Sequence, residues 1–402
     1  MAPLFVNAAR HVTVWTFLYP LTIASLSLAV EDYNIPNFSV TDLRAGRRVD
    51  DLSSVLGSTG LIAITGLGVD FSKIRKTALE SLCSCSESSE FLVMDGSDRT
   101  VLNDRLTTRT TLATATMSNI PLPLPVDQLT RHCGLEATEA MNALRDHVAL
   151  ASSGFVSALD RMIDGAASSS ESQVLLRDTQ GGMFTSISSI VDVSSNLEHF
   201  HVYSKEDTNG GQHDDLQSID SSLDTHTDAG LFLSFVPARS CVNEANEEEN
   251  SSFFVSVSGE IRRAVFPPGS VAIMLGVGAE HWLKVPEYLS LKATRHAVKM
   301  RVGEARAWYG MMNLVPENAI VHDSPVHTFA DMRANMVMTG SNIQNRRYSD
   351  STASSNRYIS IGCGSSSSSE AHHSISSSIT SPPKRVRLQM VPDSSYCNNS
   401  TN

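Results

Sequence analysis

The spacing of apolar residues changes abruptly near Gly182. Before this point apolar positions recur at helical intervals, whereas after it they fall into short β-like runs separated by turns rich in glycine and proline. The expected strands cover residues 183–193, 197–203, 231–236, 253–257, 261–266, 270–275, 291–300 and 305–314. Many short strands at such intervals are typical of a β-sandwich or jelly roll. The chain is therefore expected to be mainly β with α, with a β-sandwich or jelly-roll core in its second half.

The first half of the chain contains two helical patterns. Residues 70–82 form an amphipathic pattern that starts at an aspartate, a residue type that often caps a helix. A second pattern covers residues 126–162, and Gly134 and Gly154 are expected to divide it into two or three pieces. Prolines between positions 121 and 125 exclude a helix immediately before it. The sequence thus predicts an N-terminal helical region ahead of the strands.

Residues 1–29 have the features of a secretory signal peptide. Arg10 precedes an uncharged, apolar stretch from Val12 to Val30, which ends with the small residues Ser27 and Ala29 before acidic Glu31. The stretch is nearly long enough to span a bilayer, so an uncleaved membrane anchor is an alternative, although Pro20 disfavours a straight membrane helix. A cytosolic extension is a third interpretation. The chain is expected in the secretory pathway or outside the cell, with the cytoplasm as the alternative, and on a membrane only if anchored.

Composition limits the classes of partner and the extent of the core. The formal net charge of −12 argues against a general nucleic-acid binder, because phosphate binding needs a basic surface. From Ser341 onward, 19 of 62 residues are serine and none is phenylalanine or tryptophan. Such a segment cannot supply a core. Residues 341–402 are therefore expected to form a disordered tail.

The six cysteines leave the question of secretion open. They are Cys83, Cys85, Cys133, Cys241, Cys363 and Cys397. Cys83 and Cys85 are too close for easy mutual pairing, and the lack of any C-x-x-C motif argues against a zinc knuckle. Both are expected to be helix residues rather than redox groups. Acceptor triplets for N-glycosylation begin at Asn37, Asn250, Asn398 and Asn399, and they matter only if the chain is secreted.

The strongest candidate site combines His226, Asp228 and the distant His296. His226 and Asp228 are two residues apart, so on a β-strand both side chains point to the same side. Two imidazoles and one carboxylate can hold one face of a ferrous ion and leave three positions for a co-substrate and dioxygen. A histidine two residues before an aspartate arises readily by chance in a chain with 13 histidines. The surrounding sequence is therefore needed to judge whether these three residues form a metal site.

Several stretches around these residues occur in a recognisable order. They are Leu223–Leu231, Val265–Gly276, Leu291–Val298, Arg306–Trp308 and Met312–Pro316. Together with residues 34–43 and 59–67, they resemble the isopenicillin N synthase-like, 2-oxoglutarate- and Fe(II)-dependent dioxygenases. The resemblance covers roughly residues 34–320. It implies a double-stranded β-helix at 181–325 after an N-terminal region of opening strands and helices at 34–180.

The resemblance also implies a role for each candidate residue. Fe(II) would be bound by His226, Asp228 and His296. Arg306 would bind the distal carboxylate of 2-oxoglutarate, because a guanidinium stays charged and can grip a carboxylate through two parallel hydrogen bonds. Tyr203 would assist the same cosubstrate. Members of the family decarboxylate 2-oxoglutarate to succinate, and the expected reaction is the hydroxylation, desaturation or ring closure of a small organic molecule by dioxygen.

Two positions depart from the family pattern. The last two expected strands would form a hairpin that returns Arg306 to the barrel interior that holds His296. Two residues after this arginine the family usually has a serine that shares the carboxylate, and this chain has Trp308. Directly after the distal histidine the family usually has an arginine, and this chain has Ala297. Trp308 is bulky enough to reshape the cosubstrate pocket.

Other functional classes remain open because of these departures. The chain could be a catalytically inactive binding protein of the same fold, with Trp308 marking a lost cosubstrate site, or an iron oxidase that does not use 2-oxoglutarate. A zinc hydrolase with the same three ligands ranks lower, because zinc usually occupies a four-coordinate site without an arginine that grips an oxoacid.

Overall fold

The computed structural model describes most of the chain from Val30 to Ala334. The described residues are 30–102, 104–117, 120–121, 124–165, 173–206, 221–242, 252–321, 328–334 and 359–360. The expected signal peptide or anchor, and nearly all of the expected disordered tail, lie outside them. The fold described below belongs to the unit Glu31–Asn402. Within the described ranges, every helix is too short or too polar to cross a lipid bilayer.

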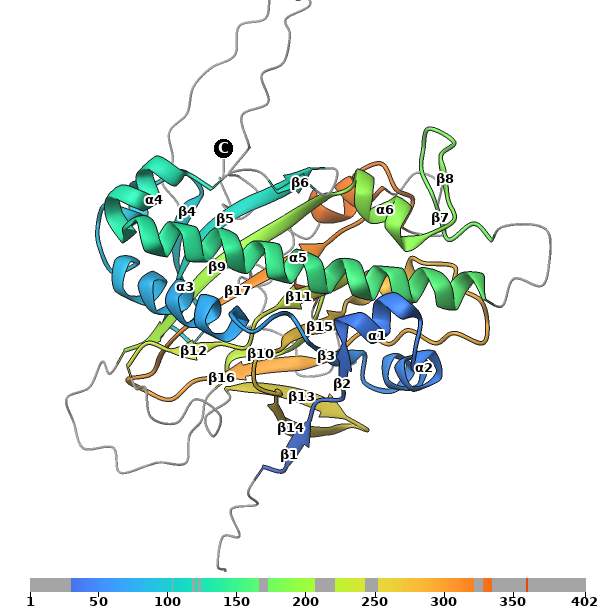
Figure 1. Ribbon diagram of the computed structural model, residues 1–402, viewed down its shortest axis with the longest axis horizontal. Coiled ribbons are helices and arrows are strands. Elements are labelled where there is room, and N and C mark those ends of the chain that lie inside the picture. The colour runs from blue at the N-terminus through green and yellow to red at the C-terminus, as the bar shows by residue number, and fades with distance from the viewer. Residues whose placement is uncertain are drawn as a thin grey trace, which may run out of the picture. The chain divides into compact units, whose positions relative to one another are not determined.

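The strands form two large sheets (Figure 1). The smaller sheet contains, in spatial order, β1 (Asp32–Asn34), β14 (Glu260–Val265), β13 (Phe253–Val257), β16 (His296–Lys299), β10 (Ser221–Asp228) and β18 (Ile359–Ser360). The larger sheet contains β2 (Asn37–Ser39), β3 (Leu61–Thr65), β15 (Val271–Leu275), β11 (Phe232–Phe235), β17 (Ala305–Asn313), β9 (Ser195–Lys205), β5 (Thr107–Met117) and β4 (Ser97–Val101). Short strands β12 (Arg239–Ser240) and β6 (Ile120–Pro121) pair with β17 and β5. A separate pair consists of β7 (Leu176–Arg177) and β8 (Met183–Phe184).

Successive strands of the second half alternate between the two sheets. The chain runs from β9 in the larger sheet to β10 in the smaller, back to β11, across to β13 and β14, back to β15, across to β16 and finally to β17. This winding is the double-stranded β-helix form of the jelly roll, in agreement with the sequence interpretation. It also means that β16 and β17 lie in different sheets, so the hairpin expected between them is wrong.

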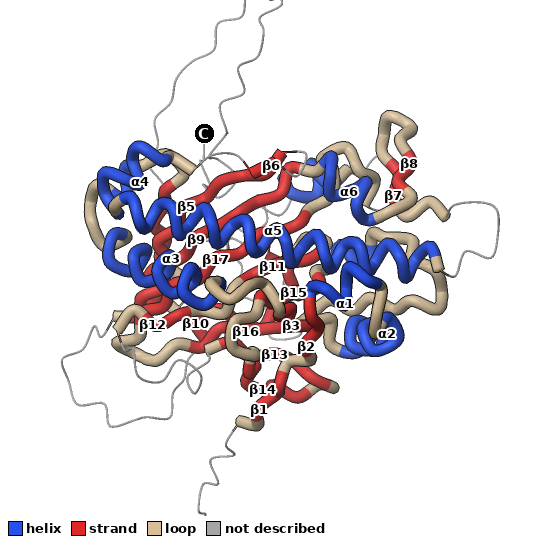
Figure 2. Tube along the Cα trace, viewed as in Figure 1, coloured by secondary structure: helices blue, strands red, loops and turns tan. Residues whose placement is uncertain are grey.

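The helices lie mainly beside the larger sheet (Figure 2). They are α1 (Val40–Ala45), α2 (Val49–Ser58), α3 (Phe71–Cys85), the 3₁₀ helix η1 (Phe91–Val93), α4 (Val126–Cys133), α5 (Leu135–Asp164), α6 (Ile187–Val193) and α7 (Val277–His281). Helix α5 packs on β11 and β15, and α3 on β9 and β17. The region before β9 also contains β1 to β6, which extend both sheets. The expected N-terminal helical region is therefore a mixture of helices and strands.

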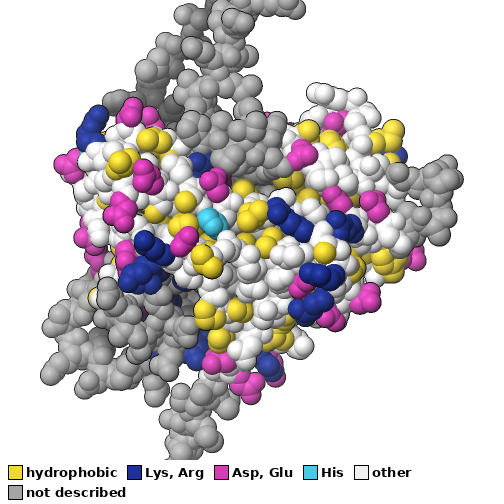
Figure 3. All heavy atoms as spheres, viewed as in Figure 1, with side chains coloured by type: hydrophobic (Ala, Val, Ile, Leu, Met, Phe, Trp, Pro, Cys, Tyr) yellow, Lys and Arg dark blue, Asp and Glu magenta, His cyan; other side chains and the backbone are white. Residues whose placement is uncertain are grey.

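Helix α5 is anchored to the larger sheet by apolar and ionic contacts. Phe155 meets Phe232 of β11 edge-on, with ring centroids 5.1 Å apart. Arg145 forms a buried ion pair with Glu198 of β9, whose carboxylate also accepts a 2.7 Å hydrogen bond from the hydroxyl of Tyr309. A buried pair that satisfies its hydrogen bonds holds a helix in one register, because removal of either partner leaves an uncompensated charge. The outer face of the helices, which is turned away from the larger sheet, carries charged side chains of both signs with apolar side chains between them (Figure 3).

Two details of the sequence interpretation were wrong for local reasons. Residues 183–193 were expected to be a strand but contain β8 and then α6. The hydroxyl of Ser186 caps α6, and the carboxylate of Asp160 accepts hydrogen bonds from the first amides of this helix. Gly134 does separate α4 from α5, but Gly154 lies inside an unbroken α5. A Cβ at Gly154 would lie 3.0 Å from the Val40 side chain, so this glycine allows close helix packing.

All four described cysteines form disulfides. Cys83 pairs with Cys241 and Cys85 with Cys133, so neither pairs with its near neighbour, as the sequence predicted. Both bonds start from the last turn of α3. One connects this helix to the segment after β12, and the other connects it to the end of α4. The two bonds close loops across sequence separations of 158 and 48 residues.

The longer disulfide is predicted to contribute more to stability. Replacement of Cys83 and Cys241 together by serine should lower the free energy of unfolding by about 2–5 kcal/mol, because the unfolded chain regains the entropy of a long loop. Denaturant titration of the oxidised protein measures this loss, and the same double replacement at Cys85 and Cys133 is the matched comparison. Peptide mapping without reduction should recover both connectivities, and a peptide pair that joins Cys83 to Cys133 would contradict the structure.

Candidate metal centre

The three candidate ligands meet between β10 and β16 in the smaller sheet. His226 and His296 are directly opposite each other in the antiparallel pairing of these strands, and their ring centroids are 4.2 Å apart. Asp228 lies two residues further along β10, with its carboxylate 3.7 Å from Nε2 of His226. One ligand atom from each residue lies within 4.8 Å of the others. The structure therefore brings together the three residues that the sequence selected.

Backbone carbonyls orient both imidazoles. Nδ1 of His226 is 2.7 Å from the carbonyl oxygen of Asp224, and Nδ1 of His296 is 3.2 Å from that of Thr294. A carbonyl only accepts, so each Nδ1 carries the proton and each Nε2 keeps its lone pair for a metal. The hydroxyl of Thr294 donates to the carbonyl of Thr59 at 2.9 Å, which fixes the segment before His296.

The electrostatics of the site favour a bound cation. Burial raises the pKa of Asp228 to about 6, against the opposing influence of His226. Burial, together with His226, also holds the pKa of His296 well below its usual value, so this imidazole is neutral at physiological pH. A buried carboxylate beside a neutral imidazole is stabilised in its charged form by a divalent metal. The donor set and its surroundings thus fit Fe(II), which accepts nitrogen and oxygen ligands on one face.

Close backbone packing holds the turn that follows Asp228. Gly276 at the end of β15 donates its amide to the carbonyl of Leu231 at 2.9 Å. A Cβ at Gly276 would lie 2.5 Å from the carbonyl oxygen of Gly230 and 2.8 Å from that of Asp228. Any larger residue would push this turn away, because backbone atoms cannot yield as a flexible side chain does. The glycine therefore helps to position the carboxylate ligand.

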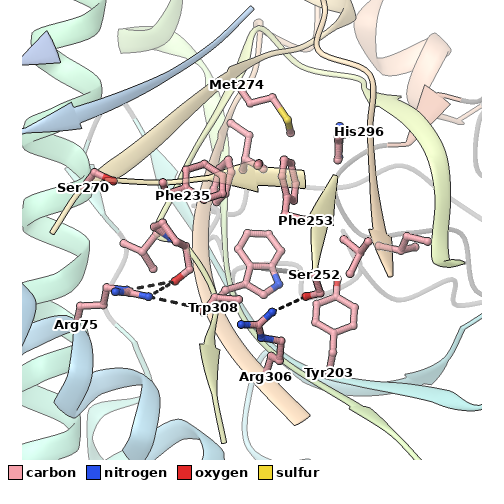
Figure 4. Close-up of a pocket in the computed structure, with 18 of the residues that line it drawn as sticks. Arg75, Tyr203, Phe235, Ser252, Phe253, Ser270, Met274, His296, Arg306 and Trp308 are labelled. Carbon is pink, nitrogen blue, oxygen red and sulfur yellow. Dashed lines mark hydrogen bonds between the residues drawn. The ribbon is translucent and has the colours of Figure 1, made fainter. Parts of the chain in front are cut away.

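Arg306 and Tyr203 line the same pocket as the three candidate ligands. Tyr203 on β9 is directly opposite Arg306 on β17, so both side chains lie on one face of the larger sheet. Nη1 of Arg306 donates to the hydroxyl of Ser252 at 2.8 Å (Figure 4). The same nitrogen lies 3.3 Å from the carboxylate of Glu304. Burial lowers the pKa of Arg306 and raises that of Tyr203. The tyrosine hydroxyl is therefore protonated and able to donate a hydrogen bond.

The two departures from the family pattern have different consequences. Trp308 does line the pocket. The centroid of its ring lies 4.9 Å from that of His201 and 6.1 Å from that of Phe235. It occupies the place where a serine was expected, but Ser252 brings a hydroxyl to Arg306 from the other sheet. Ala297 follows His296 along β16, so its side chain points to the opposite face of the strand. An arginine there would not enter the pocket.

Three residues that complete the pocket were not indicated by the sequence. Phe253 stacks on His296, with ring centroids 5.3 Å apart and planes inclined by 18°. Ser252 reaches Arg306 only because the two sheets face each other. Arg75 of α3 also lines the pocket, although it lies in a helix whose pattern indicated only packing. Each of these contacts joins segments that are far apart in the sequence, so local spacing could not reveal them.

Fold and site together define a jelly roll with a face of two histidines and one aspartate in its interior. No protein-family model matches the sequence, and no curated protein matches it. The solved structures to which the chain is similar at low identity include two dioxygenases for auxin oxidation and one fungal protein. They are the rice dioxygenase (15% identity, TM-score 0.49, 76% of this chain and 96% of that chain), dioxygenase 1 from Arabidopsis thaliana with 2-oxoglutarate (16%, 0.46, 70% and 93%), and a full-length Neurospora crassa protein in complex with alpha-KG and 5-formyluracil (12%, 0.45, 74% and 90%).

Removal of a metal ligand should strongly weaken metal binding. His296→Ala and Asp228→Ala are each expected to weaken binding of Fe(II), or of Co(II) as a spectroscopic substitute, by at least about 100-fold, since changes even to the partners of metal ligands cost about 10–100-fold. Anaerobic titration followed by absorbance measures the affinity. His281→Ala is the control, because this exposed histidine at the end of α7 lies outside the pocket. Unchanged affinity in the His296 variant would refute the proposed ligand set.

Proposed function

We propose that this protein is an Fe(II)- and 2-oxoglutarate-dependent dioxygenase that oxidises a small organic molecule. The observation that carries the proposal is the presence of His226, Asp228, His296 and Arg306 in one pocket. Three ligands on one side of a metal leave room for a bidentate oxoacid and dioxygen. A buried arginine in the same pocket offers the fixed cation that the far end of the oxoacid needs.

The distal carboxylate of 2-oxoglutarate would be held by Arg306, Ser252 and Tyr203. Ser252 already accepts a hydrogen bond from Arg306, so its own hydroxyl proton is available for a ligand. Its position is fixed because the amide of Lys299 donates to its carbonyl oxygen at 2.9 Å. Tyr203 adds a protonated hydroxyl from β9. Ser252 would thus replace the serine that is missing at position 308.

The protein would orient its ligands and exclude water. The bound iron supplies the redox chemistry, in which decarboxylation of 2-oxoglutarate to succinate is coupled to oxidation of the substrate by dioxygen. Phe235, Phe253 and Trp308 form apolar walls around the pocket. Phe253 also limits rotation of His296 by stacking on it. An apolar enclosure strengthens the few polar contacts that position a ligand, since water does not compete for them.

Binding of 2-oxoglutarate should depend on Arg306 and, more weakly, on Ser252. Arg306→Gln is expected to raise the dissociation constant at least about tenfold, and Ser252→Ala by roughly three- to tenfold, from the usual contributions of charged and neutral hydrogen bonds. The weak visible charge-transfer band of anaerobic Fe(II) protein measures binding. Arg301→Gln is the control, since Arg301 is exposed in the turn before β17. Oxygen-dependent release of succinate completes the assay.

The outcomes also separate the alternative functions. Succinate release that persists in His296→Ala would refute the dioxygenase assignment. Iron binding and oxygen consumption without the charge-transfer band would indicate an oxidase that does not use 2-oxoglutarate. Metal binding without turnover over a broad set of small molecules would favour a noncatalytic binding protein, and hydrolytic activity with Zn(II) would favour the hydrolase.

We also propose that the chain enters the secretory pathway. Two disulfides support this proposal, because such bonds persist mainly in oxidising compartments. Asn37, the first glycosylation acceptor, is exposed on β2 and so is accessible to modification. Residues 1–29 would be the cleaved signal.

Expression with the natural N-terminus tests this proposal. In cells with a secretory pathway, the product should appear in the medium with an N-terminus near residue 30. It should carry a glycan at Asn37 that endoglycosidase removes and that Asn37→Gln prevents. N-terminal sequencing and mass spectrometry provide the measurement. A chain that begins after residue 29 is the control and should remain in the cytosol. Retention of the full N-terminus in the cytosol would refute the proposal.

A further inference from the structure

Arg75 brings a second guanidinium to the pocket that holds the metal ligands and Arg306. Its Nε and Nη2 donate to the carbonyl oxygen of Pro237 at 3.2 and 2.7 Å, and Nη2 also reaches that of Ala238 at 3.4 Å. Its Nη1 donates to no described residue. Figure 4 shows that Arg75 approaches from α3, whereas Arg306 approaches from β17. The two cations therefore enter the pocket from different elements.

No acidic side chain among the described residues forms an ion pair with Arg75. The neighbouring arginines do have such partners, since Arg239 pairs with Glu80 and Arg306 with Glu304. Burial and these two positive neighbours lower the pKa of Arg75 to about 10, which still leaves it charged at physiological pH. Arg75 is half-buried, and a partly desolvated cation whose partners are neutral carbonyls is stabilised further by an anion.

We propose that Arg75 binds an anionic group of the primary substrate, and that the substrate is a small organic acid with an apolar body. This inference rests on the proposed function, in which Arg306, Ser252 and Tyr203 take the carboxylate of 2-oxoglutarate. Arg306 lies on β17, Tyr203 lies on β9, and Ser252 directly precedes β13. Arg75 lies on α3, so it belongs to a different element from all of them. A second anion, from a second ligand, would complete the charge balance of the pocket.

The pocket walls define the rest of the substrate. Phe235 forms edge-on contacts with Phe266, and Phe253 packs against both rings. These three aromatic residues line the pocket together with His296 and Arg75. Aromatic walls with a few convergent polar groups are typical of sites for small, largely apolar ligands. The carboxylate would therefore fix one end of the substrate while its apolar part lies toward the metal.

Matched acids and amides test the proposal without knowledge of the natural substrate. The probes are phenylacetate, 3-phenylpropionate and 4-phenylbutyrate, each beside its neutral amide, added to full-length protein with Mn(II) and 2-oxoglutarate. Ligand-observed NMR and calorimetry measure their dissociation constants. At least one acid should bind about tenfold or more tightly than its amide, as expected for a charge-assisted hydrogen bond. Binding of no acid, or of acids and amides equally, would overturn the proposal.

Variants at position 75 show whether Arg75 itself causes the preference for acids over amides. Arg75→Gln should remove the preference for acids, and Arg75→Lys should retain part of it because the positive charge remains. Arg239→Gln is the matched control, since it removes a nearby guanidinium that lies outside the pocket. Circular dichroism and thermal unfolding confirm that each variant is folded. An acid preference that persists in Arg75→Gln would show that another group binds the anion.

The affinity for 2-oxoglutarate separates this proposal from the proposed function. It should be unchanged in Arg75→Gln, and a loss there would place Arg75 in the cosubstrate site and overturn the inference. The acid and amide titrations are repeated without 2-oxoglutarate. If the wild-type protein binds no 2-oxoglutarate but still prefers acids in a manner that depends on Arg75, the proposed function fails while the acid site stands.

Discussion

The candidate site depends on the register between β10 and β16. His226 and His296 come together only because they are opposite each other in this antiparallel pairing. The pairing is irregular between Leu223 and His226, where the register shifts. A shift of one residue in a strand turns every side chain to the other face, so a slip at this position would direct one imidazole away from its partner. The irregularity is therefore part of what aims His226 into the pocket.

The pocket concentrates charge in an otherwise apolar interior. Asp228, Arg306 and Arg75 each have a pKa displaced from the usual value mainly because they are buried. Each displacement reflects a cost of desolvation that the folded chain bears before any ligand is present. A metal beside the carboxylate and an anion beside each guanidinium would relieve that cost. Binding and stability are thus linked, since ligands that bind only the folded state also stabilise it.

The sequence predicted what local patterns can encode. The alternation of short apolar runs was sufficient for most strands of the jelly roll, and the H-x-D pair with its distal partner identified three residues that do meet. The sequence interpretation failed where contacts with residues far away in the chain determine the local structure or the pocket lining. Residues 187–193 became helical because Asp160 and Ser186 satisfy the first amides of α6. Ser252 reaches Arg306 only across the space between the two sheets, which no spacing in the sequence records.

Helix α3 connects the disulfide framework to the pocket. Along one side of this helix, Arg75, Glu80 and Cys83 all contact the segment 237–241, through hydrogen bonds, an ion pair and a disulfide respectively. The covalent bond and the ion pair attach this segment to α3 through residues other than Arg75. Structural attachment of the segment therefore does not require a guanidinium at position 75. The guanidinium of Arg75 adds a positive charge to the pocket lining, and binding of an anionic ligand would explain why a charge lies there.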